Sequence, residues 1–473
     1  MELQQRGTVH SSSWAVLVLL CLAQFMVILD VTVVNVALPQ MSNDLDLTRT
    51  AATWVVTAYT LCFGGLLILG GRLADILGRR GVFLAGLTVF TAASLLAGLA
   101  GDTGIILGAR AAQGIGAALL SPAALSIVST MFHGPRRHKA LAVWGAVGGA
   151  GAAAGVLIGG LLVSGPGWSW VFFVNVPIGA AVAVAVAVVV PRSPRYPGRV
   201  DVPGALLLTA TAGLLIYGLV QAGNTGWTAT ATWLPIAGAA VAGAAATGLQ
   251  RSVRAPLLPT TLLRRRPVVA GNAVMLVASG LLIAGFFLTS MVAQHVFGYS
   301  ALRTGLLFLP VTVATVVSAH LTAHGLRRFG ARPVAFVAFA VASAGFGLLT
   351  GVSIHDDPVT AVLPGFVLAA AGLGAGFVTA STSVMTRVEG HEAGSASGVL
   401  NTGHELGAAL GVAIASSIAA SDLTSDPASA LSTTGFTDAY TIAAVAAAAA
   451  ALLLAAALPG GRPPVTDAPM FVH

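Results

Sequence analysis

Two oppositely charged residues interrupt long apolar stretches of this sequence, and their positions predict proton chemistry. Asp30 lies about seven residues from one end of the stretch 14–38, and Arg110 about six residues into the stretch 104–131. If both stretches are helices that cross a bilayer in opposite directions, the two charges lie at matching depth, roughly 10 Å from one surface. A charge inside a bilayer is costly unless paired, so we expect an ion pair in which Asp30 takes up and releases a proton. The alternative is a static salt bridge.

A third charge, Glu405, lies near the middle of the apolar stretch 394–420. Glycines recur around it at every fourth position and form one small-residue face: Gly403, Gly407 and Gly411. Glu405 is two positions from Gly403, about 200° around a helix, so it points away from that face, as Asn401 does. We expect Glu405 and Asn401 to line a cavity, where Glu405 attracts a cationic substrate or carries a second proton. The alternative is local pairing with His404 or a structural contact.

One face of the stretch 104–131 carries residues at helical spacing: Arg110, Gln113, Ala117 and Ser121. We interpret this face as a polar wall of a central pathway, with Gln113 in contact with a substrate. Hydrogen bonding between helices is an equally good interpretation of the same pattern.

The segment Gly71-Arg-Leu-Ala-Asp-Ile-Leu-Gly-Arg-Arg80 concentrates charge between two apolar stretches. Its carboxylate, Asp75, has three arginines near it in sequence: Arg72, Arg79 and Arg80. We expect Asp75 to pair with them or to cap the N-terminus of a helix in another part of the chain, and Gly78 to supply a tight turn. Such contacts would hold one conformation closed and break in another. The alternative is a solvated loop that only orients insertion.

Glycines also recur every four residues in the stretch 140–163, at Gly151, Gly155 and Gly159, with Gly160 beside the last of them. A small-residue face of this kind lets two helices approach closely in a membrane. The alternative is tight packing with no further role.

The composition shows what must position these residues. Of 473 residues, 56% are hydrophobic and 8% are charged, whereas a soluble domain carries about 25% charged residues. This excludes an ordinary soluble enzyme. The net charge of +7 does not indicate nucleic-acid binding, because the basic residues lie in short loops between apolar stretches. Lys139 is the only lysine, which excludes a GK[ST] phosphate loop, and Cys21 and Cys62 show no disulfide or metal spacing. We expect no metal and no cofactor.

Hydropathy predicts an all-α membrane protein with fourteen spans, because only helices satisfy the backbone in lipid and the stretches are too long for barrel strands. The predicted spans are 14–38, 51–70, 81–100, 104–131, 140–163, 169–190, 203–222, 228–248, 268–292, 302–323, 334–352, 359–385, 394–420 and 438–458. We expect two six-helix bundles, 14–190 and 268–458, with two inserted helices in 203–248. The segments 1–13, 249–267 and 459–473 are then an N-terminus, a linker and a tail.

Basic residues are distributed very unevenly across the predicted loops. Of 23 Lys and Arg residues, only Arg49 and Arg303 fall on one side of the membrane and Arg110 falls within a span. The positive-inside rule therefore places both termini in the cytoplasm.

A coarse repeat relates the two predicted bundles. The segment Ala323-His-Gly-Leu-Arg-Arg-Phe-Gly-Ala-Arg332 follows the tenth span as 71–80 follows the second, with Gly330 opposite Gly78 and Arg332 opposite Arg80. Internal repeats are typical of transporters.

Taken together, these segments resemble the major facilitator superfamily, and within it the fourteen-span drug:H+ antiporter family. The matching segments are Leu29-Asp-Val-Thr-Val-Val-Asn-Val-Ala-Leu-Pro39, Gly71 to Arg80, Arg110-Ala-Ala-Gln-Gly-Ile-Gly116, Gly151-Ala-Ala-Ala-Gly-Val-Leu-Ile-Gly-Gly160, Phe173-Val-Asn-Val-Pro-Ile-Gly179 and Gly298-Tyr-Ser-Ala-Leu-Arg-Thr-Gly305. Two positions depart from the family pattern: Val156 replaces a proline, and Ser169 replaces an arginine.

The resemblance implies a proton-coupled exporter of drugs or small amphipathic compounds, cationic ones included, that works by alternating access. In that family the first-span aspartate exchanges the proton, the segment 71–80 is the conformational switch, and the fifth-span glycine face limits leak. The expected partners are a small-molecule substrate, protons and a bacterial inner membrane, and the expected state is a monomer. A dedicated exporter of one natural product or lipid is an alternative, and a non-transporting sensor or scaffold is a more distant one.

Overall fold

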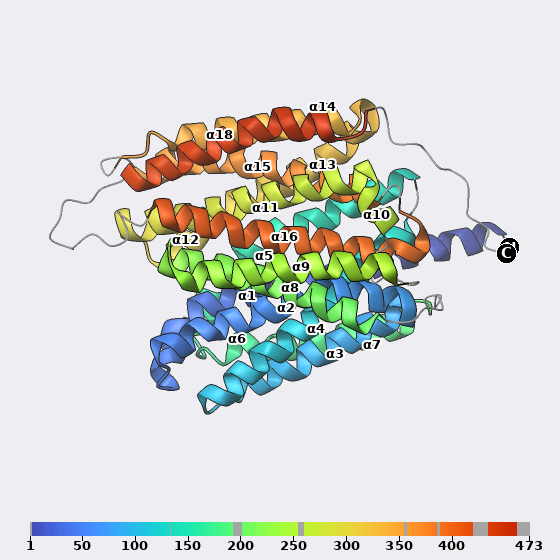
Figure 1. The fold of residues 1–473 in the computed structure, drawn as a ribbon, viewed down its shortest axis with the longest axis horizontal. Helices are drawn as coiled ribbons and strands as arrows, with labels where there is room; N and C mark the ends of the chain where they lie inside the picture. The colour runs from blue at the N-terminus through green and yellow to red at the C-terminus, as the bar shows by residue number, and fades with distance from the viewer. Residues whose placement is uncertain are drawn as a thin grey trace.

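The computed structural model of the chain describes residues 2–132, 134–192, 201–253, 260–353, 357–385, 388–419 and 434–460, and all regular structure in these ranges is helical. Long helices lie side by side along one axis of the molecule (Figure 1). The first helices of the chain, blue to cyan in the figure, form one side of the bundle, and the last, yellow to red, form the other.

The helices fall into three groups along the chain. The N-terminal group comprises α1 (Glu2–Asp44), α2 (Arg49–Leu77), α3 (Arg79–Gly98), α4 (Thr103–Met131), α5 (Gly134–Ser164), α6 (Trp170–Phe173) and α7 (Asn175–Val189). The middle group comprises α8 (Val202–Thr225), α9 (Thr230–Ser252) and the short α10 (Thr260–Arg264). The C-terminal group comprises α11 (Arg266–Met291), η1 (Val292–Val296), α12 (Ala301–Leu307), α13 (Leu309–Phe329), α14 (Ala331–Leu349), α15 (Pro358–Met385), η2 (Gly390–Glu392), α16 (Ala393–Ile418) and α18 (Thr434–Ala457).

Twelve helices in the described part of the chain are long and apolar enough to cross a membrane. The predicted count of fourteen is therefore not confirmed. The fifth and thirteenth predicted spans coincide with α5 and α16, which are long helices but are not among the twelve. In α16 the apolar run is interrupted by Asn401, His404 and Glu405, which lowers its mean hydropathy.

The segment 71–80 is helical rather than a loop. Arg72 and Asp75 lie in the last turns of α2, and Arg79 and Arg80 begin α3. Gly78 alone makes the turn, with a φ of 95°, a conformation that favours glycine because it has no Cβ. This differs from the sequence prediction, in which 71–80 lies between the spans 51–70 and 81–100. One glycine at this φ is enough to reverse the chain, so the charged residues on both sides of it remain helical.

The repeat seen in the sequence is also present in the geometry. Gly330, between α13 and α14, has a φ of 85° and occupies the same kind of turn as Gly78. Arg80 donates to the carbonyl of Ala187 near the end of α7, and Arg332 donates to the carbonyl of Leu458, just after α18. Each arginine thus links the start of the third long helix of its group to the C-terminal end of the last helix of that group.

The two outer groups meet along two lines of contact, α2 with α16 and α5 with α13. At the first line the helices are very close, since a Cβ on Gly71 would collide with the backbone of Gly394. Helix α8 of the middle group packs against both α2 and α16, and α9 packs on α8 (Figure 1). The middle pair therefore covers one of the two lines at which the groups meet.

The glycine face of α5 packs on α1. A Cβ on Gly151 would meet Ile28, one on Gly155 would collide with Thr32, and one on Gly159 would lie 3.3 Å from Val33. Gly160 does not belong to this face, because a Cβ there would meet nothing within 4 Å. The side chain of Val156 lies outside what the structure describes.

Candidate functional site

Asp30 and Arg110 form the predicted ion pair in the middle of the N-terminal group. The Nη1 atom of Arg110 lies 2.5 Å from Oδ2 of Asp30, and the two side chains are 1% and 0% exposed. The depth match read from the sequence therefore corresponds to a direct contact between α1 and α4. A pair buried this completely is costly unless further hydrogen bonds satisfy both groups.

Those further bonds come from amide side chains on two helices. Gln113 donates to Oδ1 of Asp30 at 2.9 Å and accepts from Nη1 of Arg110 at 2.8 Å. Asn175, the first residue of α7, donates to the same Oδ1 at 3.2 Å. Ser94 of α3 accepts from Gln113 at 2.8 Å. Arg110, Gln113 and Asn175 all donate to Asp30, so both of its carboxylate oxygens act as acceptors in this network.

Arg110 has two more contacts that hold its guanidinium in place. Its Nε donates to the carbonyl of Val55 at 3.0 Å, and its Cζ lies 4.4 Å from the centre of the Tyr59 ring. A guanidinium over an aromatic face is attracted to the ring's electron density. The Tyr59 hydroxyl is buried and has no hydrogen-bond partner in the described part of the chain.

Sequence reasoning missed Ser94, Asn175 and Tyr59 as members of this network. Asn175 carried a signal, because it is an amide inside a predicted span, two residues before Pro177, in a segment that matches the family pattern. Ser94 and Tyr59 carried none, because neutral polar residues are common in apolar helices and only the fold shows which of them meet. Gln113 is 0% exposed and bonded within the network, so its contacts in this conformation are helix–helix hydrogen bonds.

Glu405 lies outside this network, in contact with His404. Nδ1 of His404 is 3.2 Å from Oε1 of Glu405, and the side chains are 33% and 17% exposed. The glycine face of α16 packs on α11, where a Cβ on Gly407 would collide with Leu276. Glu405 points away from that face, as predicted, and its Cβ lies beside Gly64 of α2.

Two amides near Glu405 have unused hydrogen-bonding atoms among the described residues. Nδ2 of Asn401, one turn before Glu405, is buried without an acceptor. Oδ1 of Asn272, on α11 beside Gly403, is buried without a donor. Tyr59, whose ring lies against the Arg110 guanidinium, belongs to α2, the helix whose Gly64 lies beside Glu405.

Asp75 caps the N-terminus of α16. From the sequence we expected either such a cap or an ion pair with an arginine. Its Oδ1 accepts from the backbone of Gly394 at 2.8 Å, and its Oδ2 accepts from the backbone of Ser395 at 2.8 Å and from the Ser395 hydroxyl at 3.0 Å. A carboxylate is favoured at the N-terminus of a helix by the helix dipole and by its free N–H groups. This contact links the N-terminal and C-terminal groups.

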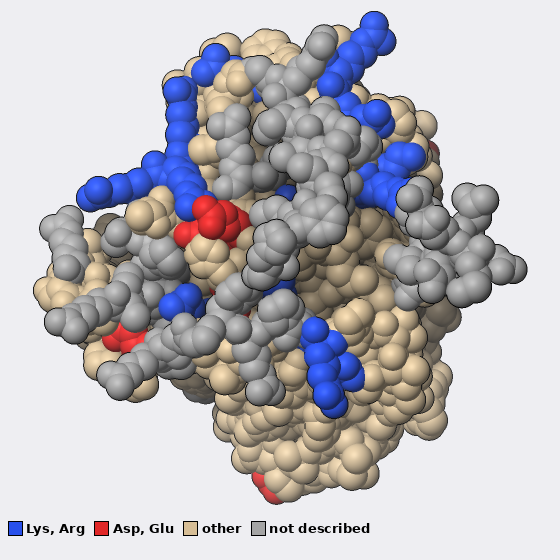
Figure 2. Space-filling view, turned by 90° about the vertical axis from the view of Figure 1, so that its right-hand side faces the viewer, with Lys and Arg blue, Asp and Glu red and all other residues tan. Residues whose placement is uncertain are grey.

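Arginines reinforce the same end of the molecule. Arg79 lies 3.7 Å from Asp75 and also donates to the carbonyl of Gly390. Arg137, at the start of α5, donates to the carbonyl of Met385 at the end of α15. Burial lowers the pKa of Arg137 to about 10, which leaves it charged at neutral pH. Figure 2 looks onto this end and shows Lys and Arg side chains gathered around it.

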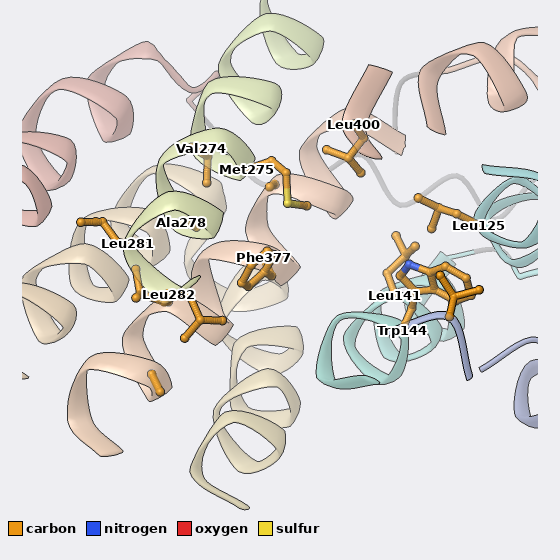
Figure 3. Close-up of a cluster of buried hydrophobic side chains, with 14 of the residues drawn as sticks. Leu125, Leu141, Trp144, Val274, Met275, Ala278, Leu281, Leu282, Phe377 and Leu400 are labelled. Carbon is orange, nitrogen blue, oxygen red and sulfur yellow. The ribbon is translucent and has the colours of Figure 1, made fainter. Parts of the chain in front are cut away.

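A hydrophobic layer lies between this end and the His404–Glu405 pair. In Figure 3, Leu400 of α16 and Phe377 of α15 lie opposite Leu125 of α4 and two residues of α5, Leu141 and Trp144, and all five belong to one buried cluster. Along α16 the order is Ser395, bonded to Asp75, then Leu400 in this layer, then His404. The layer and the polar contacts thus lie where the N-terminal and C-terminal groups meet at this end of the molecule.

Both the sequence and the fold are similar to those of known proteins. Residues 20–412 match the sequence family described as Major Facilitator Superfamily. The chain belongs to the major facilitator superfamily. It is 39% identical to the puromycin resistance protein pur8 of Streptomyces alboniger over 404 residues, covering 83% of this chain and 79% of that protein. It is 38% identical to the cephamycin export protein CmcT of Amycolatopsis lactamdurans, covering 84% and 83%.

Solved structures agree on the fold. The human organic anion transporter MFSD10 superimposes on this major facilitator protein with a TM-score of 0.67 over 93% of this chain and 99% of that one, at 16% identity. The proton:xylose symporter XylE superimposes with a TM-score of 0.65 at 16% identity, covering 96% and 97%. The chain is thus a multi-pass membrane transporter and not an enzyme, with relatives named for antibiotic resistance and export.

Proposed function

We propose that this protein exports small amphipathic antibiotics or drugs across a bacterial inner membrane in exchange for protons. The observation that carries the proposal is Asp30, a fully buried carboxylate held by Arg110, Gln113 and Asn175. A proton that reaches Asp30 removes the negative charge that Arg110 needs in a dry environment. The pair then favours a different arrangement of α1 and α4, and this couples proton binding to a change of conformation.

The Asp75 end faces the cytoplasm in this proposal, and the conformation described is closed on that side. The gathering of Lys and Arg at this end supports the orientation, because cytoplasmic loops carry the excess of basic residues. Both termini are then cytoplasmic. Fourteen spans follow if α5 and α16 also cross the membrane, with six-helix halves at 14–190 and 268–458 and inserted helices in 203–248. Most of the tail, from residue 461 onward, lies outside the described residues.

We place the substrate next to Glu405 and Asn401. Both lie on the side of α16 that faces the N-terminal half, and Glu405 is partly exposed in the conformation in which Asp30 is not. The predicted contact of Gln113 with substrate requires the Asp30 network to open first.

A dedicated exporter of one natural product is the second candidate. Relatives of the chain are named after single antibiotics: puromycin, cephamycin and lincomycin. An exporter of this kind would have a narrow substrate range, and these names fit it as well as they fit the drug exporter proposed above.

Uptake into inside-out vesicles with an imposed pH gradient tests both candidates. The panel contains puromycin, lincomycin, cephamycin, tetracenomycin C and unrelated dyes. We expect gradient-dependent uptake by the wild type and none by Asp30→Asn. Uptake of one antibiotic alone supports the dedicated exporter, and uptake of several supports the drug exporter. If no compound accumulates, or if Asp30→Asn transports as well as the wild type, the proposal is wrong.

A further inference from the structure

Helices α2 and α16 touch each other directly only towards the Asp75 end of the molecule. There, a Cβ on Gly71 would collide with the backbone of Gly394, and a Cβ on Gly398 would lie 2.7 Å from the carbonyl oxygen of Leu67. Contacts this close leave no room for a third helix. At this end the N-terminal and C-terminal groups therefore meet without the middle group.

Farther from Asp75, helix α8 contacts α2 and α16 at separate places. Tyr217 of α8 stacks on Trp54 of α2, with ring centroids 6.0 Å apart. Trp227, just after α8, donates to the hydroxyl of Ser417 near the end of α16 at 3.0 Å. Helix α8 thus supplies the wall between the two groups along the part of α2 and α16 that is remote from Asp75.

Ile216 of α8 lies between these two kinds of contact. A Cβ on Gly64 of α2 would collide with Cδ1 of Ile216 and would lie 3.6 Å from Cβ of Glu405. Ile216 and Glu405 therefore approach the same point of α2, and the missing side chain at position 64 leaves the space that Ile216 occupies. An apolar side chain of the middle group thus lies next to the carboxylate beside which we place the substrate.

The surroundings of Ile216 have the composition of a small-molecule site. Resting on the function proposed above, we propose that Ile216 packs on the flat apolar part of an aromatic amphipathic substrate and so helps to select it. Such sites combine apolar walls with a few polar groups. Here the polar groups are Glu405 and Asn401, whose Nδ2 is buried without an acceptor in the described part of the chain. Phe377, with its ring 5.6 Å from the ring of His404, adds an aromatic surface from α15.

Equilibrium binding of radiolabelled puromycin to the purified full-length protein in lipid nanodiscs tests the proposal. This probe carries a flat methoxyphenyl group on a polar aminonucleoside. Ile216→Ala removes three carbon atoms of the proposed contact, so we expect the affinity to fall about tenfold or more. Ile236→Ala is the matched control, because Ile236 packs on the other side of α8, where a Cβ on Gly218 would lie 2.6 Å from its Cγ1. This variant should bind puromycin as the wild type does.

A second pair of variants tests the same contact from α2. The Cβ of Gly64→Ala would displace the Ile216 side chain, so we expect weaker binding of puromycin. Ile216→Val removes Cδ1, the atom with which that Cβ collides. The double variant should therefore bind more tightly than Gly64→Ala alone, and this recovery can be measured even if Ile216→Ala does not fold.

Three results would overturn the proposal. The first is an affinity that is unchanged in Ile216→Ala or that falls equally in Ile236→Ala, because Ile216 would then only pack α8 in place. The second is a double variant that binds no better than Gly64→Ala. The third is a wild type that does not bind puromycin. If the vesicle assay still shows export of other compounds, only this inference fails; if it shows no export, the proposed function fails.

Discussion

Asp30 is the residue whose loss should separate folding from transport. Asp30→Asn keeps the shape of the side chain but leaves Arg110 without its counter-ion, and breaking a buried pair costs about 3–5 kcal/mol. We expect a folded protein of lower thermal stability with no gradient-driven uptake in inside-out vesicles. Asp44→Asn is a matched control on the same helix, because Asp44 accepts only from Trp168 in the described contacts. Uphill uptake by Asp30→Asn would contradict the role of Asp30.

Asn175 tests whether the donors around Asp30 tune the proton step. Asn175→Leu has a similar branched shape, although it is larger, and removes one hydrogen bond to the carboxylate; a bond to a charged group contributes about 1.5–3 kcal/mol. Because that bond helps to hold Asp30 in the network, gradient-driven uptake should slow about tenfold or more. Initial rates of uptake into inside-out vesicles measure the loss. Asn35→Leu should transport at the wild-type rate, since Asn35 is exposed and in the described contacts bonds only to Val31 within α1; an equal loss in both variants would show that Asn175 has no specific role.

At the scale of elements, the cap of α16 by Asp75 should control the conformational cycle. Asp75→Asn keeps one acceptor oxygen and loses the charge, and removing a cap costs about 0.5–2 kcal/mol. A loss of this size changes the ratio of closed to open conformers about 2- to 30-fold. We expect slower transport with unchanged substrate affinity, measured by uptake rate and equilibrium binding. Asp201→Asn is the control: Asp201 caps α8 within its own segment, so normal transport by both variants would show that the contact between groups is not a switch.

The packing of α5 on α1 offers a second test at this scale. Leucine at position 155 would collide with Thr32, two residues beyond Asp30, and overpacking costs about 1–3 kcal/mol. Gly155→Leu should displace α1, disturb the Asp30 network and abolish coupled uptake. Gly160→Leu, with nothing within 4 Å of its Cβ position, should transport normally. Equal activity of the two variants would show that α1 tolerates displacement.

For the whole molecule, the number of spans is open to direct measurement. Fourteen spans require that both α5 and α16 cross the membrane. Single cysteines at Lys139 and Ser164, and at Glu389 and Ser416, bracket these helices in a background without Cys21 and Cys62. An impermeant thiol reagent should label Lys139→Cys and Glu389→Cys from the cytoplasmic side only, and the other two from the outside only. Labelling of both members of a pair from one side would rule out that span.

Contacts between residues far apart in the sequence were predictable where the residues are charged, because an unpaired charge in a membrane is costly. Asp30 and Arg110 had to meet because neither tolerates lipid alone, and Asp75 needed donors that a helix N-terminus supplies. Ser94 and Tyr59 could not be predicted as members of the network, because an unpaired hydroxyl costs less than an unpaired charge and is satisfied in many ways; Asn175 carried a signal, but nothing in the sequence tied it to Asp30. The turn at Gly78 was predicted, but the helical form of the residues around it was missed, because the charged residues ended the apolar runs and the predicted spans therefore stopped at 70 and resumed at 81.

The place of α8 makes the two sides of the transporter unequal. Ile216 of α8 reaches between Gly64 of α2 and Glu405 of α16. Trp54 of α2 stacks on Tyr217 of α8 at 6.0 Å, while Trp227, just after α8, donates to Ser417 of α16. Helix α8 thus contacts both outer groups on one side of the molecule, whereas on the other side the two groups meet directly through α5 and α13. If the two groups separate during transport, we expect the α5–α13 line to open more readily than the line that α8 bridges.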